Sequence, residues 1–329
     1  MYQVNTETAR AAVMFAVIAL GSAPAAAITL SNGPGDGTVS VGVDAFGSFG
    51  NGLFVGAPPP GVHDADYDPV GGTGPTGTVF QSGIAIGVGG SRTFMSSGTI
   101  GGNGGGTVGS PVIGGGISAA SAFTFGGLSV TLTQSLTALF TGGSRTGTVL
   151  VQKYALTNAS GGALGFDVYR YLDADLLFDN DTSADGGGRI VQDGIEVLFA
   201  TDTATNAVDP VTSVGIAALG GALPAAGRHE VDAWSVVRDH IRDGGALDDT
   251  VANDADANGI VDAGNGLDMT MGLRNSFALA DGETAIYTTL IIFGNGETSL
   301  WDAIPGPAPL STLVAGLVGM GLLRRKRRI

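Results

Sequence analysis

Short runs of β-branched and aromatic residues recur through the middle of the chain, and turn-forming Gly, Asn, Asp and Pro separate them. This pattern is typical of antiparallel strands joined by turns. It predicts an all-β domain over residues 28–304, most simply a jelly-roll-like antiparallel β-sandwich with one or two short helices. The clearest strand runs are residues 38–43, 78–88, 128–132, 148–156, 163–172, 190–199 and 284–293.

Two of these runs form the clearest predicted hairpin. Residues 148–156 are followed by a turn rich in Gly, Asn and Ser, and then by residues 163–172. Leu164, Phe166 and Val168 alternate with other residues, so they share one face of the second strand. The short connection predicts that the two strands pair with each other.

Two segments depart from the strand pattern. Val231, Trp234, Val237 and Ile241 are spaced near the 3.6-residue helical period, which predicts a helix in this region. Residues 101–116 (GGNGGGTVGSPVIGGG) are dominated by glycine, which predicts a turn-rich loop. No repeat of 20 to 50 residues is present, so propellers and solenoids are disfavoured.

The N-terminal segment has the features of a secretory signal peptide. Residues 11–20 (AAVMFAVIAL) form an apolar run, which Gly and Pro then interrupt. Ala25 and Ala27 provide the small side chains that signal peptidase requires at positions −3 and −1. We therefore expect residues 1–27 to be removed by signal peptidase after Ala27; a buried N-terminal helix is the alternative.

The C-terminal segment, residues 305–329, predicts a membrane anchor. Closely spaced prolines precede an apolar stretch, residues 308–323, whose 16 residues span about 24 Å as a helix. Five basic residues follow and place the tail in the cytoplasm with the body outside, by the positive-inside rule. These basic residues are Arg324, Arg325, Lys326, Arg327 and Arg328.

This order of proline motif, apolar helix and basic tail resembles the PEP-CTERM superfamily of sorting signals, particularly its VPLPA-CTERM variant. Residues 304–308 (IPGPA) match that variant at Pro305, Pro307 and Ala308. The resemblance implies recognition by an exosortase in a Gram-negative bacterium that makes exopolysaccharide. It also implies display at the cell surface or in the extracellular matrix after processing. An ordinary C-terminal membrane anchor is the alternative.

The charge distribution restricts the partners. The formal net charge is −15, and because the five terminal basic residues contribute +5, the rest of the chain carries −20. Such a body repels nucleic acid and anionic membrane surfaces. The partners that fit this negative charge are divalent cations and neutral polymers, such as exopolysaccharide. Another surface protein is a further candidate partner. The chain has no Cys, which excludes thiolate metal sites and cysteine nucleophiles.

The best candidate cation site is an acidic loop at residues 254–262 (DADANGIVD). Carboxylate or amide oxygens stand at loop positions 1, 3, 5 and 9, and Gly is at position 6, as in EF-hand and dockerin-type calcium loops. The candidate calcium ligands are Asp254, Asp256, Asn258, the carbonyl of Ile260 and Asp262. Position 12 departs from the pattern, because it is Asn265 where a bidentate Glu or Asp is expected. A plain Asp/Asn/Gly turn is the alternative to a calcium site.

A second, weaker acidic cluster follows the predicted strand at 163–172. Asp173 and Asp175 alternate along it and project on the same side, so with Asp179 and Asp181 they are candidate ligands for a hard cation. A solvated acidic loop is the alternative.

The motifs of common hydrolases are missing from the sequence. It contains neither a Gly-x-Ser-x-Gly elbow nor a His-Glu-x-x-His motif, and its three histidines stand in different contexts. We expect His229, Glu230 and His240 to be surface residues. Two classes remain, a non-enzymatic binding or structural component and a secreted hydrolase acting on polysaccharide or peptide. The sparse catalytic chemistry favours the first.

Overall fold

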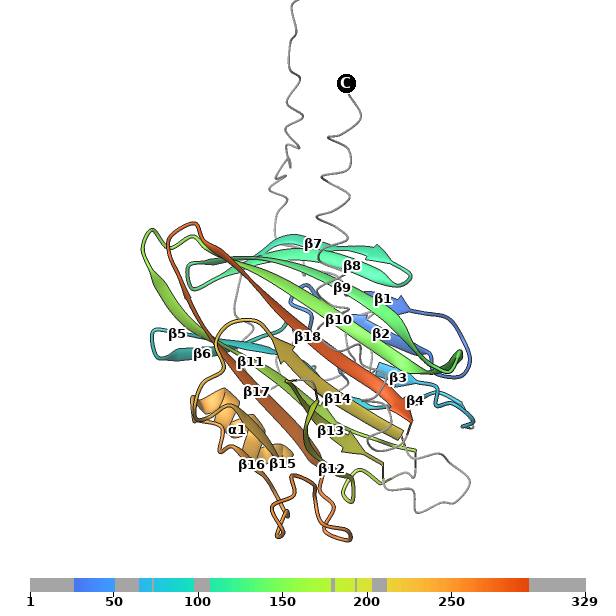
Figure 1. Cartoon of the computed structure of the whole chain (residues 1–329). Helices are drawn as coiled ribbons and strands as arrows, with labels where there is room; N and C mark the ends of the chain where they lie inside the picture. The colour runs from blue at the N-terminus through green and yellow to red at the C-terminus, as the bar shows by residue number, and fades with distance from the viewer. Residues whose placement is uncertain are drawn as a thin grey trace, which may run out of the picture.

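The computed structural model describes residues 27–50, 65–72, 74–97, 107–178, 181–192, 194–202 and 212–295. These residues form a mostly β structure with three sheets and one short helix (Figure 1). Ala25 and the sorting segment at 305–329 lie outside the described residues. Within the described part, no helix combines the length and the apolar composition that a membrane span needs.

The largest sheet has eight strands, and every neighbouring pair in it is antiparallel. In spatial order its strands are β12 (Gly186–Gln192), β13 (Ile195–Thr201), β14 (Thr212–Leu219), β18 (Thr284–Asn295), β10 (Ser144–Asn158), β9 (Leu128–Thr141), β8 (Ser118–Phe125) and β7 (Thr107–Gly115).

The second sheet has six strands, and only its β15–β16 pair is parallel. Its order is β16 (Thr250–Val251), β15 (His229–Ala233), β17 (Met269–Leu279), β11 (Leu164–Ala174), β5 (Val79–Val88) and β6 (Ser91–Met95). A small third sheet contains β1 (Ile28–Ser31), β2 (Val39–Val43), β3 (Ala65–Tyr67) and β4 (Thr76–Gly77).

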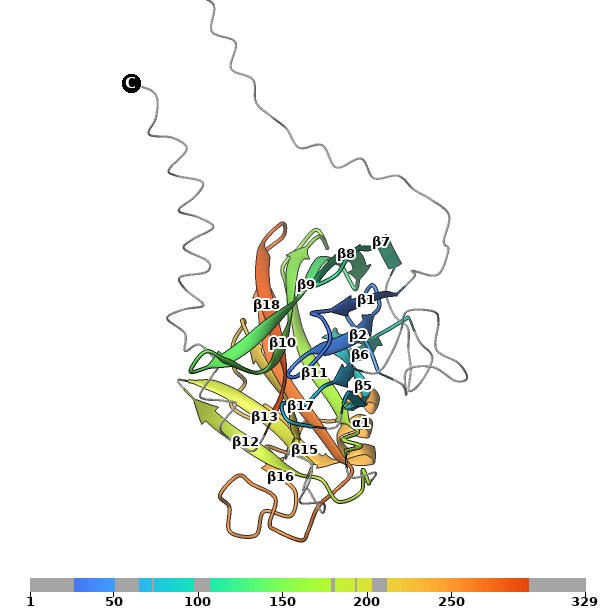
Figure 2. The same cartoon turned by 90° about the vertical axis from the view of Figure 1, so that its right-hand side faces the viewer.

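The main hydrophobic core joins the sheets, which lie against one another in Figures 1 and 2. Leu150 and Ile291 of the eight-stranded sheet belong to the same buried cluster as Leu273 of the six-stranded sheet. Phe277 on β17 and Tyr287 on β18 meet edge to face, with ring centroids 6.0 Å apart. Burial of this apolar surface is the dominant stabilising contribution to such a fold.

The predicted hairpin between residues 148–156 and 163–172 is wrong. The first run lies in β10, which pairs with β9 and β18, and the second lies in β11, which pairs with β5 and β17. The connection therefore crosses from one sheet to the other. Asn158 fixes this crossing, because its Nδ2 donates to the carbonyls of Gly162 at 2.6 Å and Leu279 at 3.0 Å. The predicted alternation is correct, since Leu164, Phe166 and Val168 all pack in or against the main core, whereas Tyr169 and Tyr171 face the other side of the sheet.

Two further expectations are corrected. Residues 107–115, within the segment predicted to be a loop, form the edge strand β7, which pairs irregularly with β8. The run 190–199 is divided between β12 and β13, with Gly194 in the left-handed region (φ +78°) at the turn. Glycine permits both the irregular edge and the tight turn, so its presence in 101–116 did not exclude a strand.

The predicted helix is present, but it begins later than the spacing indicated. Val231 lies in β15, and α1 spans Trp234–Asp243 with Val237 and Ile241 buried. These two side chains pack on the outer face of the six-stranded sheet with Tyr169 and Tyr171. The helix thus covers this face of the six-stranded sheet, where it contacts strands from β15 to β6 (Figures 1 and 2).

Candidate functional site

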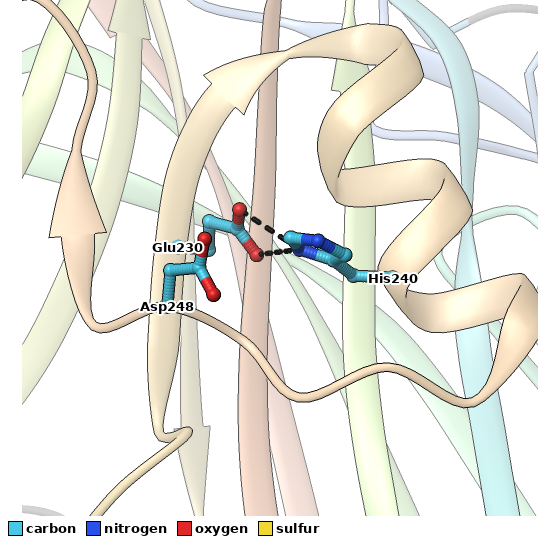
Figure 3. Close-up of side chains that lie close together, drawn as sticks. All are labelled: Glu230, His240 and Asp248. Carbon is cyan, nitrogen blue, oxygen red and sulfur yellow. Dashed lines mark hydrogen bonds and ion pairs between the residues drawn. The ribbon is translucent and has the colours of Figure 1, made fainter.

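Glu230, His240 and Asp248 meet where β15, α1 and the following loop come together (Figure 3). The Nδ1 atom of His240 lies 2.8 Å from Oε2 and 3.0 Å from Oε1 of Glu230. One ligand atom of each of the three residues can be chosen so that all lie within 4.8 Å of one another. The arrangement thus places one imidazole and two carboxylates in a single cluster.

The fold determines where each of these side chains points. Val231 faces the main core, so Glu230 before it faces the opposite side of the sheet, toward α1. The helix approaches closely because β17 has Gly272 there, and a Cβ on this residue would lie 3.1 Å from Val237 Cγ1. That close contact brings His240, on the helix, to Glu230.

Arg92 on β6 holds the C-terminal end of α1. Its Nη1 donates to the carbonyls of His240 at 2.7 Å and Gly245 at 2.9 Å, and its Nη2 donates to the hydroxyl of Tyr169 at 2.5 Å. A cation at this end of a helix also interacts favourably with the helix dipole. The backbone of His240 is therefore tied to the sheet.

The burial of the cluster is graded from inside to outside. Glu230 is 0% exposed, the side chain of His240 is 31% exposed, and Asp248 is exposed. Burial raises the pKa of Glu230, and the hydrogen bond to Glu230 raises the pKa of His240. The expectation that Glu230 is a surface residue is wrong. Successive side chains of β15 face opposite sides of the sheet, and because a helix follows, this alternation was the available signal that Glu230 would be covered.

His229, also expected at the surface, belongs to a neighbouring charged network. Glu196 accepts from Arg189 Nε at 2.6 Å and pairs with Arg228 Nε at 2.9 Å. His229 Nδ1 lies 3.5 Å from both Glu196 and Asp249, and its side chain is only 12% exposed. Burial lowers the pKa of His229. Its predicted surface position is therefore also wrong.

The acidic loop predicted from residues 254–262 brings three of its candidate ligands together. One carboxylate oxygen each from Asp254, Asp256 and Asp262 can be chosen within 4.8 Å of the others. Asn258 is close to them, since its Nδ2 donates to Asp256 Oδ2 at 3.0 Å. The Oδ1 atom of Asn258 accepts from the amide of Ile260 at 2.8 Å.

The loop is fastened to the sheet at its centre. The amide of Arg189 on β12 donates to Gly259 O at 2.7 Å, and the amide of Val261 donates to Gly187 O at 2.9 Å. Val261 is 7% exposed and belongs to the main core. Val261, at loop position 8, therefore attaches the loop to the core.

The weaker predicted cluster does not converge in the same way. Among the described residues, Asp173, Asp175 and Asp181 are not in either group of closely spaced ligand atoms, and Asp179 lies outside the described residues. Asp181 is exposed and accepts from the amide and the hydroxyl of Ser183. Asp181 therefore lies in a different environment from Asp173 and Asp175.

Asp173 nevertheless has unusual chemistry. It is 3% exposed and accepts from Thr270 Oγ1 at 2.7 Å. Burial raises its pKa to about 7, and nearby Asp268 and Asp175 add to this effect. Burial and Asp268 also raise the pKa of Asp175 to about 6. A carboxyl group that titrates near neutral pH can exchange protons, which is a property of catalytic acids and bases.

The comparisons with known proteins provide no functional assignment. No protein-family model matches the sequence, and no curated protein matches it. A solved structure described as "Putative kojibiose phosphorylase from human microbiome" is similar at 9% identity with a TM-score of 0.36. The match covers 82% of this chain and 33% of that one, so the chain spans about a third of that protein's length. A likeness at this level transfers neither activity nor substrate.

Proposed function

We propose that the chain is an exported protein of the cell surface or extracellular matrix of a Gram-negative bacterium. In this proposal it is a non-enzymatic binding or structural component associated with exopolysaccharide or with another surface protein. The observation that carries it is the order of proline motif (residues 304–308), apolar stretch (308–323) and basic tail. Signal peptidase would act at the N-terminus, and an exosortase near the proline motif.

The domain organisation in this proposal has three parts. Residues 1–27 are the signal peptide, residues 28–304 form one extracytoplasmic β-sandwich, and residues 305–329 are the sorting segment. The shared core of the eight-stranded and six-stranded sheets supports a jelly-roll-like sandwich. Residues 308–323 hold the chain in the inner membrane until processing.

Calcium is the proposed cofactor, bound by the acidic loop. The support is the approach of Asp254, Asp256 and Asp262, together with the attachment of the loop through Val261. Calcium prefers several oxygen ligands and tolerates a flexible coordination geometry. Turning the side chain of Asn258 and using the carbonyl of Ile260 would complete the predicted ligand set. The ion would relieve the repulsion among the three carboxylates.

The location is tested by deleting residues 305–329 from the full chain in an exosortase-containing host. We expect the intact protein in membrane and surface fractions and the deleted protein in the soluble fraction. A matched variant changes Arg324, Arg325, Lys326, Arg327 and Arg328 to Gln; it keeps the length and should lose its orientation. Retention of the deleted protein in the membrane would overturn the proposed anchor.

The calcium site is tested by thermal unfolding in calcium and in excess chelator. Calcium at a hundredfold excess over its dissociation constant should stabilise the protein by about 2.7 kcal/mol. The double variant Asp254→Ala/Asp256→Ala should lose this increment. A variant with the same change of charge, Asp239→Ala/Asp243→Ala on α1, should keep it. An equal melting temperature in both buffers for the unmodified protein would contradict the site.

A secreted hydrolase remains the second candidate, favoured by the pKa of Asp173. Asp173 and Asp175 would then supply an acid and a base for cleavage of a polysaccharide or peptide. Measured hydrolysis of purified exopolysaccharide that disappears in Asp173→Asn would favour this candidate over the first.

A further inference from the structure

We propose that Glu230, His240 and Asp248 form a binding site for one divalent transition-metal ion, with zinc as the best match. This inference does not rest on the proposed function, and the site is separate from the acidic loop. It would give the chain two cation sites of different chemistry.

The spacing of the three residues fits a metal ion at their centre. Zinc binds His nitrogen and carboxylate oxygen at about 2.0–2.2 Å, so neighbouring ligand atoms of a tetrahedral site lie about 3.3 Å apart. The His240 Nδ1 atom and the Glu230 oxygens are 2.8 and 3.0 Å apart, and Asp248 brings an oxygen within 4.8 Å of both. Small side-chain rotations would therefore admit the ion.

The buried carboxylate supplies an independent indication. Glu230 is 0% exposed, yet both of its oxygens share a single donor, the Nδ1 atom of His240. No other described residue donates a hydrogen bond to this carboxylate. A carboxylate has about four acceptor positions, and burying it with so few partners is costly. A cation between Glu230, His240 and Asp248 would offset this cost.

The three ligands are held by separate parts of the fold, which favours a preformed site. Glu230 lies on β15, in register with Gly272 of β17. His240 lies on α1, which the buried side chains of Val237 and Ile241 attach to the sheet. Asp248 is followed by Asp249, whose carboxylate accepts from two backbone amides at 2.6 Å. Ligands positioned in this way lose little conformational freedom when the ion binds.

The donor set selects the class of metal. One imidazole with two carboxylates suits zinc, manganese, iron or cobalt, whereas calcium prefers oxygen ligands alone. The exposure of Asp248 leaves room for water as a fourth ligand. The acidic loop contains only oxygen donors, so the two sites should distinguish between zinc and calcium.

The test uses the purified full chain, freed of metal with a chelator and titrated calorimetrically with zinc chloride. We expect one zinc ion to bind with an affinity that calcium does not match. Cobalt chloride should give the visible absorption bands of tetrahedral Co²⁺, which report nitrogen and oxygen coordination directly. Absence of zinc binding to the metal-free protein would overturn the proposal.

Variants distinguish this site from other zinc-binding positions. His240→Gln and Asp248→Asn should each weaken zinc binding by more than about 100-fold, because loss of an outer-shell partner alone costs about 10–100-fold. Asp248 is exposed, so its substitution should not impair folding, and thermal unfolding of the metal-free variants checks this. Asp254→Ala/Asp256→Ala should bind zinc normally. Unchanged zinc affinity in both His240→Gln and Asp248→Asn would refute the assignment.

Discussion

Asp173→Asn should stabilise the protein at alkaline pH but not at acidic pH. Asp173 is almost wholly buried, and burial raises its pKa in the folded state to about 7 from 3.8. Asparagine has the same shape and carries no charge. Its Oδ1 can still accept from Thr270 Oγ1, and its amide can donate to the hydroxyl of Tyr171.

The size and sign of the effect follow from the two pKa values. A raised folded-state pKa means that the folded protein binds this proton more tightly than the unfolded chain does. The free energy of unfolding is therefore highest below about pH 4 and falls as the pH rises toward 7. About three pKa units at 1.36 kcal/mol each give a loss of about 4 kcal/mol. Asp173→Asn removes this loss.

The assay is urea unfolding at pH 4.5, 6 and 8, followed by tryptophan fluorescence. We expect the variant to be more stable than the unmodified protein by only about 1 kcal/mol at pH 4.5 and by up to about 4 kcal/mol at pH 8. Asp281→Asn, which neutralises an exposed carboxylate, is the control and should show no such trend. A difference between Asp173→Asn and the unmodified protein that is equal at all three pH values would refute the reasoning.

Three other substitutions test separate features. Ala27→Arg should block signal-peptide removal, so terminal sequencing should no longer find Ile28 first, because the −1 pocket admits only small side chains. Gly272→Ala should destabilise the protein by about 1–3 kcal/mol in urea unfolding, because its Cβ would press on Val237 beneath α1. Arg170 is 0% exposed, burial lowers its pKa to about 10, and two of its nitrogens lack a described hydrogen-bond partner. Burying this charge is therefore costly, so its replacement in Arg170→Met should not lower the melting temperature. A large loss of stability in this last variant would contradict that reasoning.

Several of the strands were predictable from the sequence, but their partners were not. Alternation in residues 163–172 depends on neighbouring residues alone, so the buried face of Phe166 and Val168 was correctly predicted. The partner of β10 depends on the whole sheet. Leu150 pairs with Leu136 on one side and with Ile291 on the other, and no local pattern contains the second pairing.

The two cation clusters also differ in whether local sequence alone could predict them. Asp254, Asp256 and Asp262 lie within nine consecutive residues, so their spacing alone predicted their approach. Glu230 and His240 come together only because α1 folds back onto the sheet over Gly272. The sequence indicated the helix but neither the strand β15 before it nor the way the two pack together. For that reason the pair was expected at the surface.

The position of β18 affects the order in which the domain can assemble. This strand is the last one in the described chain, yet it lies inside the eight-stranded sheet, between β14 and β10. Until residues 284–295 have left the ribosome, β14 and β10 lack the strand that joins them, so their inner edges have no partner in this sheet. The largest sheet can therefore close only after nearly all of the described chain has been synthesised.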